Sequence, residues 1–239
     1  MTGEREAEFE RLASIADDSW YACGSNAASI LHRTALLRRF WKGQRCLELG
    51  PAEGLMTSTL AEAFADLTLV DGSERFCADL RAQFPAVTVV CSLFEEFKPS
   101  APFDTIILGH VLEHVADPKA LLVASREWLA PEGVICMTVP NAMSIHRQAA
   151  VLMGLLADVR ELNETDLHHG HRRVYDPESF RADISEAGLR LTEFGGYWLK
   201  PLSMAQIDRD WSAEMLAAFM TLGERYPDVA AELYAIAGA

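Results

Sequence analysis

The chain has 239 residues, of which 50% are hydrophobic and 23% are charged, so it is long enough for one domain with a full core. It has only 10 prolines and 15 glycines and no repeat or low-complexity tract, which excludes collagen-like, disordered and solenoid proteins. The net charge of −14 disfavours nucleic acid as a partner, because phosphate-binding surfaces depend on clustered lysine and arginine.

Targeting signals and membrane spans are not indicated. The first residues, MTGEREAEFERL, lack the apolar stretch of a signal peptide, and no later segment reaches the roughly 18 apolar residues of a span. The cysteines form no C-x-x-C pair, which is typical of reduced thiols; they are Cys23, Cys46, Cys77, Cys91 and Cys136. We therefore expect a cytoplasmic protein that binds no membrane, as a monomer or homodimer.

Helical periodicity over residues 4–41, broken near 21–24, predicts a helical N-terminal cap spanning 1–44. After it, short apolar runs alternate with amphipathic segments, as parallel strands do when helices connect them. The runs are 46–49, 67–70, 87–91, 105–108, 134–139, 189–194 and 231–237. This rhythm predicts a doubly wound α/β fold.

Capping residues mark the helices between these runs. We expect helices at 54–64, 74–84 after Ser73, 119–129 after Asp117-Pro118, 178–187 between Asp176-Pro177 and Gly188, and 212–225. Two longer excursions, 141–175 and 198–229, exceed what a connection needs, and we expect them to cover a substrate site. Residues 45–140 would then be the cofactor-binding core of a single domain over 1–239.

A glycine-containing turn and an acid form the main binding motif. The first predicted strand runs into Glu48-Leu49-Gly50-Pro51-Ala52-Glu53-Gly54, a tight turn where a ligand can approach the backbone and a helix N-terminus. The second strand ends in Asp71-Gly72, where an acid 21 residues past Gly50 is placed to accept ribose hydroxyls. A dehydrogenase would need G-x-G-x-x-G, which this loop lacks.

This motif resembles that of the class I S-adenosylmethionine-dependent methyltransferases, with Ala52 in place of the middle glycine. The resemblance covers about 45–237 and implies a Rossmann-like seven-stranded sheet of order 3-2-1-4-5-7-6, with the last strand antiparallel. It also implies S-adenosylmethionine as methyl donor and S-adenosylhomocysteine as product.

The resemblance further implies a role for each motif residue. Glu48 and the 50–54 backbone would hold the methionine portion, Asp71 the ribose, the segment after the third strand the adenine, and His110 the region of the sulfonium. The residues expected at the cofactor are Glu48, Gly50, Pro51, Ala52, Gly54, Asp71, Gly72, Ser92, Leu93, Phe94 and His110.

Two histidine-rich segments supply candidates for catalysis. A helical turn beginning at His110 would place Glu113 and His114 on the same face, and three further histidines lie within 168–171. Because histidine can take a proton near neutral pH, we expect the base to be His114 or His171, then His169, with Glu113 orienting an imidazole. The alternatives are that Glu113 or His114 caps a turn or orients a loop, and that the histidines of 168–171 form a solvated patch.

These segments also resemble, in part, the metal-dependent branch of the family. Ubiquinone-biosynthesis O-methyltransferases and small-RNA 2′-O-methyltransferases carry Glu-x-x-Glu-His, and His110 replaces the first Glu here. Candidate ligands for a divalent metal are His110, Glu113 and His114, with His169 or His171 as the fourth.

The acceptor is expected to be a hydroxyl of a small, sugar-like or natural-product molecule in biosynthesis, because a base helps such a group most. The alternatives are N- or C-methylation, and less so a non-catalytic cofactor-binding module, which the intact motif disfavours. Aromatic side chains that could line its pocket, or simply pack, are Trp20, Tyr21, Tyr197, Trp198 and Trp211. Arginines that could hold an acidic group on it, or be solvated, are Arg147, Arg172 and Arg173.

Overall fold

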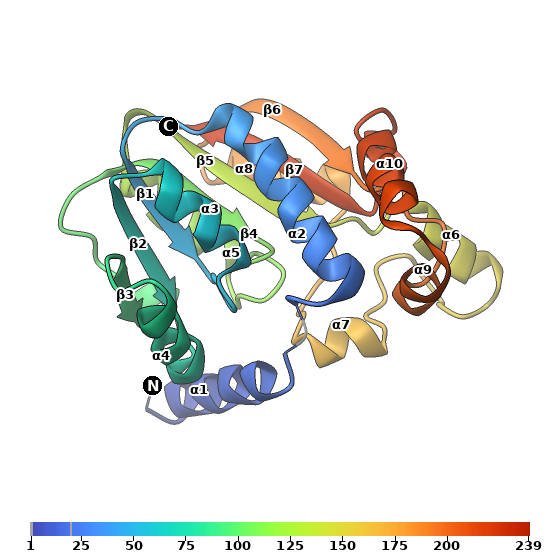
Figure 1. The fold of residues 1–239 in the computed structure, drawn as a ribbon, viewed down its shortest axis with the longest axis horizontal. Coiled ribbons are helices and arrows are strands. Elements are labelled where there is room, and N and C mark those ends of the chain that lie inside the picture. The colour runs from blue at the N-terminus through green and yellow to red at the C-terminus, as the bar shows by residue number, and fades with distance from the viewer. Residues whose placement is uncertain (1, 20) are drawn as a thin grey trace.

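One seven-stranded sheet with helices on both faces forms the centre of the molecule (Figure 1). The structure is a computed structural model, and it describes residues 2–19 and 21–239. The strand order is β3-β2-β1-β4-β5-β7-β6, as predicted. Strand β7 is antiparallel to both of its neighbours, and the other pairs are parallel.

The predicted runs all become strands, with ends that differ by a few residues. The strands are β1 (Arg45–Leu49), β2 (Asp66–Asp71), β3 (Thr88–Cys91), β4 (Phe103–Gly109), β5 (Leu129–Pro140), β6 (Arg190–Tyr197) and β7 (Glu232–Gly238). The α-helices are α1 (Thr2–Asp17), α2 (Gly24–Leu37), α3 (Leu55–Ala63), α4 (Glu74–Gln83), α5 (Pro118–Glu127), α6 (Ile145–Leu152), α7 (Glu164–His168), α8 (Pro177–Glu186), α9 (Met204–Asp210) and α10 (Ala213–Gly223).

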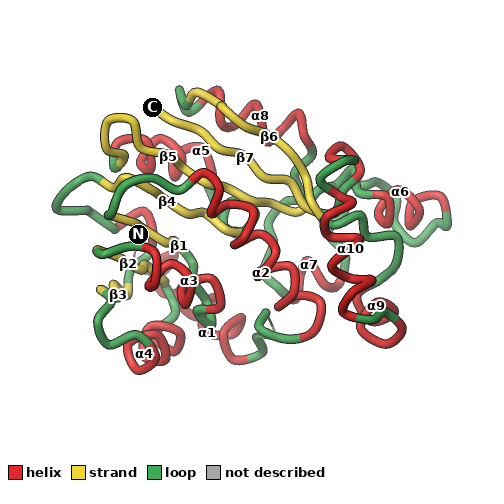
Figure 2. The backbone as a smooth tube through the Cα atoms, turned by 45° about the horizontal axis from the view of Figure 1, so that its top comes forward, coloured by secondary structure: helices red, strands yellow, loops and turns green. Residues whose placement is uncertain are grey.

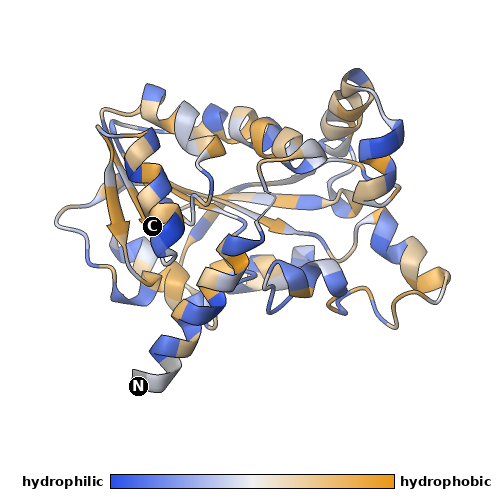
Figure 3. Cartoon of the chain, turned by 60° about the horizontal axis from the view of Figure 1, so that its bottom comes forward, coloured by the Kyte–Doolittle hydropathy of each residue, from blue (hydrophilic) through white to orange (hydrophobic). Residues whose placement is uncertain are grey.

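Two hydrophobic clusters lie on opposite faces of the sheet, because successive strand residues point to opposite sides. Cys46 belongs to the cluster that packs under α2, α3, α4 and α10, and Leu47 belongs to the one under α5 and α8. Figure 2 shows the tube of the sheet between these helices, and Figure 3 shows mainly apolar strands beneath helices with hydrophilic outer turns. Within the described residues, we find no helix with the length and apolarity needed to cross a bilayer.

The predicted capping residues begin the helices as expected. The Ser73 side chain accepts a hydrogen bond from the Phe76 N–H, and the Asp117 carboxylate accepts one from Ala120 N–H at 2.9 Å. Asp176 accepts from the N–H groups of two residues in the first turn of α8, and Gly188 follows that helix with a φ of +73°. These local signals set where each crossover helix starts, and so which loops reach the carboxyl edge of the sheet.

Gly223 provides a test of the packing between α10 and the chain after β6. A Cβ atom there would lie closer than 3.0 Å to backbone atoms of Tyr197, Trp198 and Leu199. Backbone cannot yield as a flexible side chain can, so we expect Gly223→Ala to lower the free energy of unfolding by about 1–3 kcal/mol, measured by chemical denaturation. Gly3→Ala is the control, since the methyl group that it adds in α1 meets no atom within 4 Å apart from the helix's own backbone and the neighbouring residues. Equal stability of the two variants would contradict this packing.

Candidate active site

A cavity of about 650 Å³ opens at the carboxyl ends of β1, β2, β4 and β5. This volume is within the range of small-molecule sites. Its walls come from α1 and α2, the strand tips and both long excursions. A ligand at this edge therefore meets groups from segments far apart in the sequence.

The loop between β1 and α3 shapes one end of the cavity. The Gly50 N–H donates to Val70 O at 2.9 Å, which fixes the loop against β2. Ala52 has a φ of +48°, the left-handed conformation that favours glycine and costs other residues about 1–2 kcal/mol. Gly54, with a φ of +77°, does not line the cavity but lies against Leu80 of α4 and against Phe84, which follows that helix. Ala52 thus holds a conformation that a glycine would adopt without this cost.

Two buried carboxylates lie beside this loop. Glu48 accepts a hydrogen bond from Thr57 Oγ1 at 2.6 Å, and burial raises its pKa to about 7. Asp71 accepts from the Ser73 N–H at 2.8 Å, and burial raises its pKa to about 6. Both residues line the cavity. A cationic or hydroxyl-bearing ligand would offset the cost of keeping these groups ionised, which fits the ammonium and ribose of the expected cofactor.

The predicted adenine-binding segment forms the adjoining wall. Ser92, Leu93 and Phe94 line the cavity after β3. The Ser92 N–H donates to Asp71 O at 3.0 Å, which ties this wall to the tip of β2. Apart from Gly54, all the residues expected at the cofactor therefore meet at one cavity.

His110 does not begin a helical turn, so that expectation is wrong. Its N–H is held by Thr138 O of β5 at 3.0 Å, and its backbone is left-handed with a φ of +61°. The imidazole instead lies between two buried acids. Its Nδ1 is 3.1 Å from Glu113 Oε1, and its Nε2 is 3.3 Å from Glu232 Oε2.

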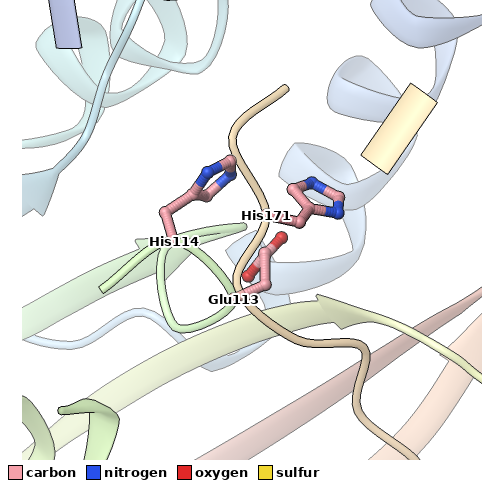
Figure 4. Close-up of side chains that lie close together, drawn as sticks. All are labelled: Glu113, His114 and His171. Carbon is pink, nitrogen blue, oxygen red and sulfur yellow. The ribbon is translucent and has the colours of Figure 1, made fainter. Parts of the chain in front are cut away.

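Glu113, His114 and His171 form a compact group, with their side chains turned toward one another in Figure 4. Their ligand atoms all lie within 4.8 Å of one another. Glu113 is fully buried, and its Oε1 pairs with His110 Nδ1. Burial opposes its charge, but His110 and the other two histidines outweigh burial and lower its pKa to about 2. These three side chains could hold a divalent cation, whereas the predicted ligands His110 and His169 lie outside the group.

The two histidines of this group differ in environment. Burial lowers the pKa of His114 to about 3. His171 Nδ1 lies 3.2 Å from Asp166 Oδ1, and Asp166 in turn bonds Arg147 Nη1 at 2.9 Å. Although burial works against the charged imidazole, the Asp166 hydrogen bond and nearby carboxylates raise the pKa of His171. His171 is thus the more basic of the two.

His169 lies to one side of the group. Its ring stacks on Tyr21 with centroids 4.8 Å apart, and burial lowers its pKa to about 4. Both residues line the cavity. His169 is therefore better suited to packing at the cavity wall than to accepting a proton.

The predicted arginines hold loops, and of the three only Arg147 lines the cavity. Arg172 Nε donates to His114 O at 2.8 Å, and Arg173 donates to Leu112 O and Val115 O. Arg147 is buried and bonds Val159 O as well as Asp166. Backbone carbonyls and a carboxylate already engage these three groups, which leaves fewer of their donors for an acidic acceptor; that they bind one stays a prediction.

The predicted aromatic residues have different positions. Tyr21 and Trp198 line the cavity, and the Tyr197 hydroxyl lies 3.5 Å from His110 Nε2. Trp211 packs on Phe219 with centroids 4.6 Å apart and is not in the lining, and Trp20 lies outside the described residues.

Several cavity residues were missed from the sequence. One had a signal, since Glu232 is an acid inside the apolar run 231–237. The others lie in segments with no motif and are brought in by tertiary packing; they are Arg33, His146, Asp166 and Lys200.

Comparison with known proteins agrees with this geometry. A family model described as "Methyltransferase domain" matches residues 24–193, more than two thirds of the chain. The chain is similar to the ubiquinone biosynthesis O-methyltransferases of Pasteurella multocida (24% identical, 74% of this chain and 78% of the relative) and Cereibacter sphaeroides (29%, 74% of each). Its fold is similar to N-methyltransferase NodS from Bradyrhizobium japonicum with S-adenosyl-L-homocysteine (TM-score 0.60, 17% identical, 98% and 97% covered).

Three observations lead to one assignment. They are the strand order of the sheet, the glycine turn with a buried acid at the tip of the second strand, and the family match over most of the chain. The chain belongs to the methyltransferase-domain family and is a class I S-adenosylmethionine-dependent methyltransferase.

Proposed function

We propose that this enzyme methylates a hydroxyl group of a small molecule, with His171 as the general base. The observation that carries the proposal is the pair of His171 and Asp166, which are 3.2 Å apart at the wall of the cavity. The carboxylate stabilises a proton on Nδ1 and leaves Nε2 to accept the proton of the acceptor hydroxyl.

The donor would occupy the end of the cavity that Glu48, Asp71 and Phe94 line. When bound there, S-adenosylmethionine supplies an electrophilic methyl group on its sulfonium. Arg33 of α2 also lines this cavity, and its Nε is buried with no hydrogen-bond partner in the described chain. We assign Arg33 to the carboxylate of the methionine portion, because a buried Nε–H without an acceptor is costly and a carboxylate would accept from it.

The remaining groups orient the reaction. An in-line transfer needs the acceptor oxygen held close to the methyl carbon, so alignment supplies much of the rate. Glu113 and Glu232 hold the His110 imidazole from both sides, and the two excursions would cover the acceptor. The likeness to O-methyltransferases supports the oxygen acceptor, and N-methylation stays the alternative because the similar structure is an N-methyltransferase.

The donor site can be tested by calorimetric titration with S-adenosylhomocysteine. We expect Asp71→Ala to weaken binding at least tenfold, since it removes the ribose acceptor, while Asp79→Ala on the exposed side of α4 leaves binding unchanged. Binding by wild type should also weaken as pH falls from 8 to 5.5. Carboxyls with pKa values raised to about 7 and 6 are ionised at the upper limit and take up protons on the way down. If neither Asp71→Ala nor the fall in pH from 8 to 5.5 changes the affinity for S-adenosylhomocysteine, these acids do not belong to the donor site.

The base can be tested by following S-adenosylhomocysteine formation with acceptors found by screening hydroxyl compounds against amine counterparts. We expect His171→Ala to lower kcat about 10²–10⁴-fold, as removal of a general base does, with donor affinity intact. Asp166→Asn should lower kcat less and shift the pH profile. His168→Ala is the control, from a histidine in the same segment that does not line the cavity. An unchanged kcat in His171→Ala, or turnover of amines alone, would contradict the proposal.

The metal alternative uses Glu113, His114 and His171 and needs a separate test. A base mechanism predicts that chelator treatment leaves turnover unchanged. Loss of turnover, restored by zinc or manganese but not by an inert salt, would assign the three side chains to a cation instead.

A further inference from the structure

Lys200 places an ammonium group in the lining of the cavity. It follows β6 and lines the cavity with Trp198, and its Nζ lies 4.9 Å over the Trp198 ring. The segment is fixed, since the Trp198 N–H donates to Met220 O at 2.9 Å and the Leu199 N–H to Phe219 O at 2.8 Å. The backbone that leads to Lys200 is thus fixed against α10.

The carboxylates around Lys200 are engaged elsewhere. Asp166 bonds Arg147 and His171, and Glu232 lies within ion-pair distance of His110. In the described chain, neither acid forms an ion pair or hydrogen bond with Lys200, and both act on it only at longer range. An ammonium in the cavity lining that has no acceptor in the described chain would be stabilised by a bound anion.

His146 supplies a second polar atom on the same side. It stands in the first turn of α6 and lines the cavity, and its Nδ1 is buried with no hydrogen-bond partner in the described chain. Lys200 and Arg147 are the charged groups that, after burial, most favour its neutral form. A neutral imidazole can donate one hydrogen bond to an anion that the ammonium attracts.

We propose that Lys200 and His146 form a subsite for an anionic group, a carboxylate or a phosphate, on the methyl acceptor. This inference rests on the proposed function, because it places the acceptor in the part of the cavity that the donor residues leave open. The acceptor would carry its hydroxyl toward His171 and its acidic group toward Lys200. The charge-assisted bond sets specificity, since a neutral analogue leaves the ammonium unpaired.

The test uses protein saturated with S-adenosylhomocysteine, so that the donor site is filled and its occupancy is measured first. Benzoate, phenyl phosphate and the neutral isostere benzamide are then titrated by calorimetry. We expect wild type to bind at least one of the two anions tenfold or more tightly than benzamide, and the preferred anion tells carboxylate from phosphate. Lys200→Met should abolish the preference, Lys200→Arg should retain it, and His146→Leu should reduce it.

Lys119→Met, at an exposed lysine paired with Glu186 on another surface, is the control and should keep the preference. Wild-type protein that binds S-adenosylhomocysteine but treats anions and benzamide alike would overturn the subsite and leave the methyltransferase assignment standing. Failure to bind S-adenosylhomocysteine would count against the proposed donor site instead. If Lys200→Met misfolds and loses donor binding, the other two results test the subsite. An anion preference in wild type that His146→Leu reduces supports it, and an unreduced preference in His146→Leu contradicts it.

Discussion

The buried charge of Glu113 is the constraint around which this site is organised. A fully buried carboxylate is stable only with cationic or hydrogen-bonding neighbours, and here three imidazoles surround it. Satisfying Glu113 requires the loop after β4 and the loop after α7 to come together. The backbone completes the clamp, since Arg172 N–H donates to Glu113 O at 2.8 Å and the Arg172 side chain reaches His114 O.

The parallel sheet supplies the second constraint, because the carboxyl ends of β1, β2, β4 and β5 meet at one edge. The predicted donor residues stand at the first two tips, and the histidine group stands at the third. Helix α1 closes over this edge through Arg11, which donates to Gly170 O, and through Glu8, which binds Arg172. The donor and the candidate base are thus brought together by topology, and the cover is tied to the loop that carries His171.

Much of the fold could be predicted because its signals are local. Apolar runs and caps such as Ser73 depend on neighbouring residues, and the Gly50 to Asp71 spacing follows from a single βαβ unit. The backbone at His110 could not be predicted, since its left-handed conformation depends on Thr138 in another strand. Lys200 and Asp166 were missed for the same reason, because only tertiary packing gives them neighbours in the cavity. Arg172 and Arg173 show the reverse case, in which residues expected at the cavity lie outside its lining. The sequence shows their charge but not the carbonyl groups that accept their hydrogen bonds.

The distribution of charge in the cavity bears on the choice between oxygen and nitrogen acceptors. An amine acceptor must lose a proton before it can attack, and free carboxylates at Glu232 and Asp166 in the lining, with Glu113 buried behind them, would hold its cationic form. Those acids are instead engaged by His110, His171 and Arg147, while the Lys200 ammonium has no such partner in the described chain. Apart from the groups assigned to the donor, those left open to a ligand here are therefore the Lys200 ammonium and His171 Nε2. That combination favours an acidic acceptor with a hydroxyl over a basic one with an amine, because the cation would repel a protonated amine as it binds.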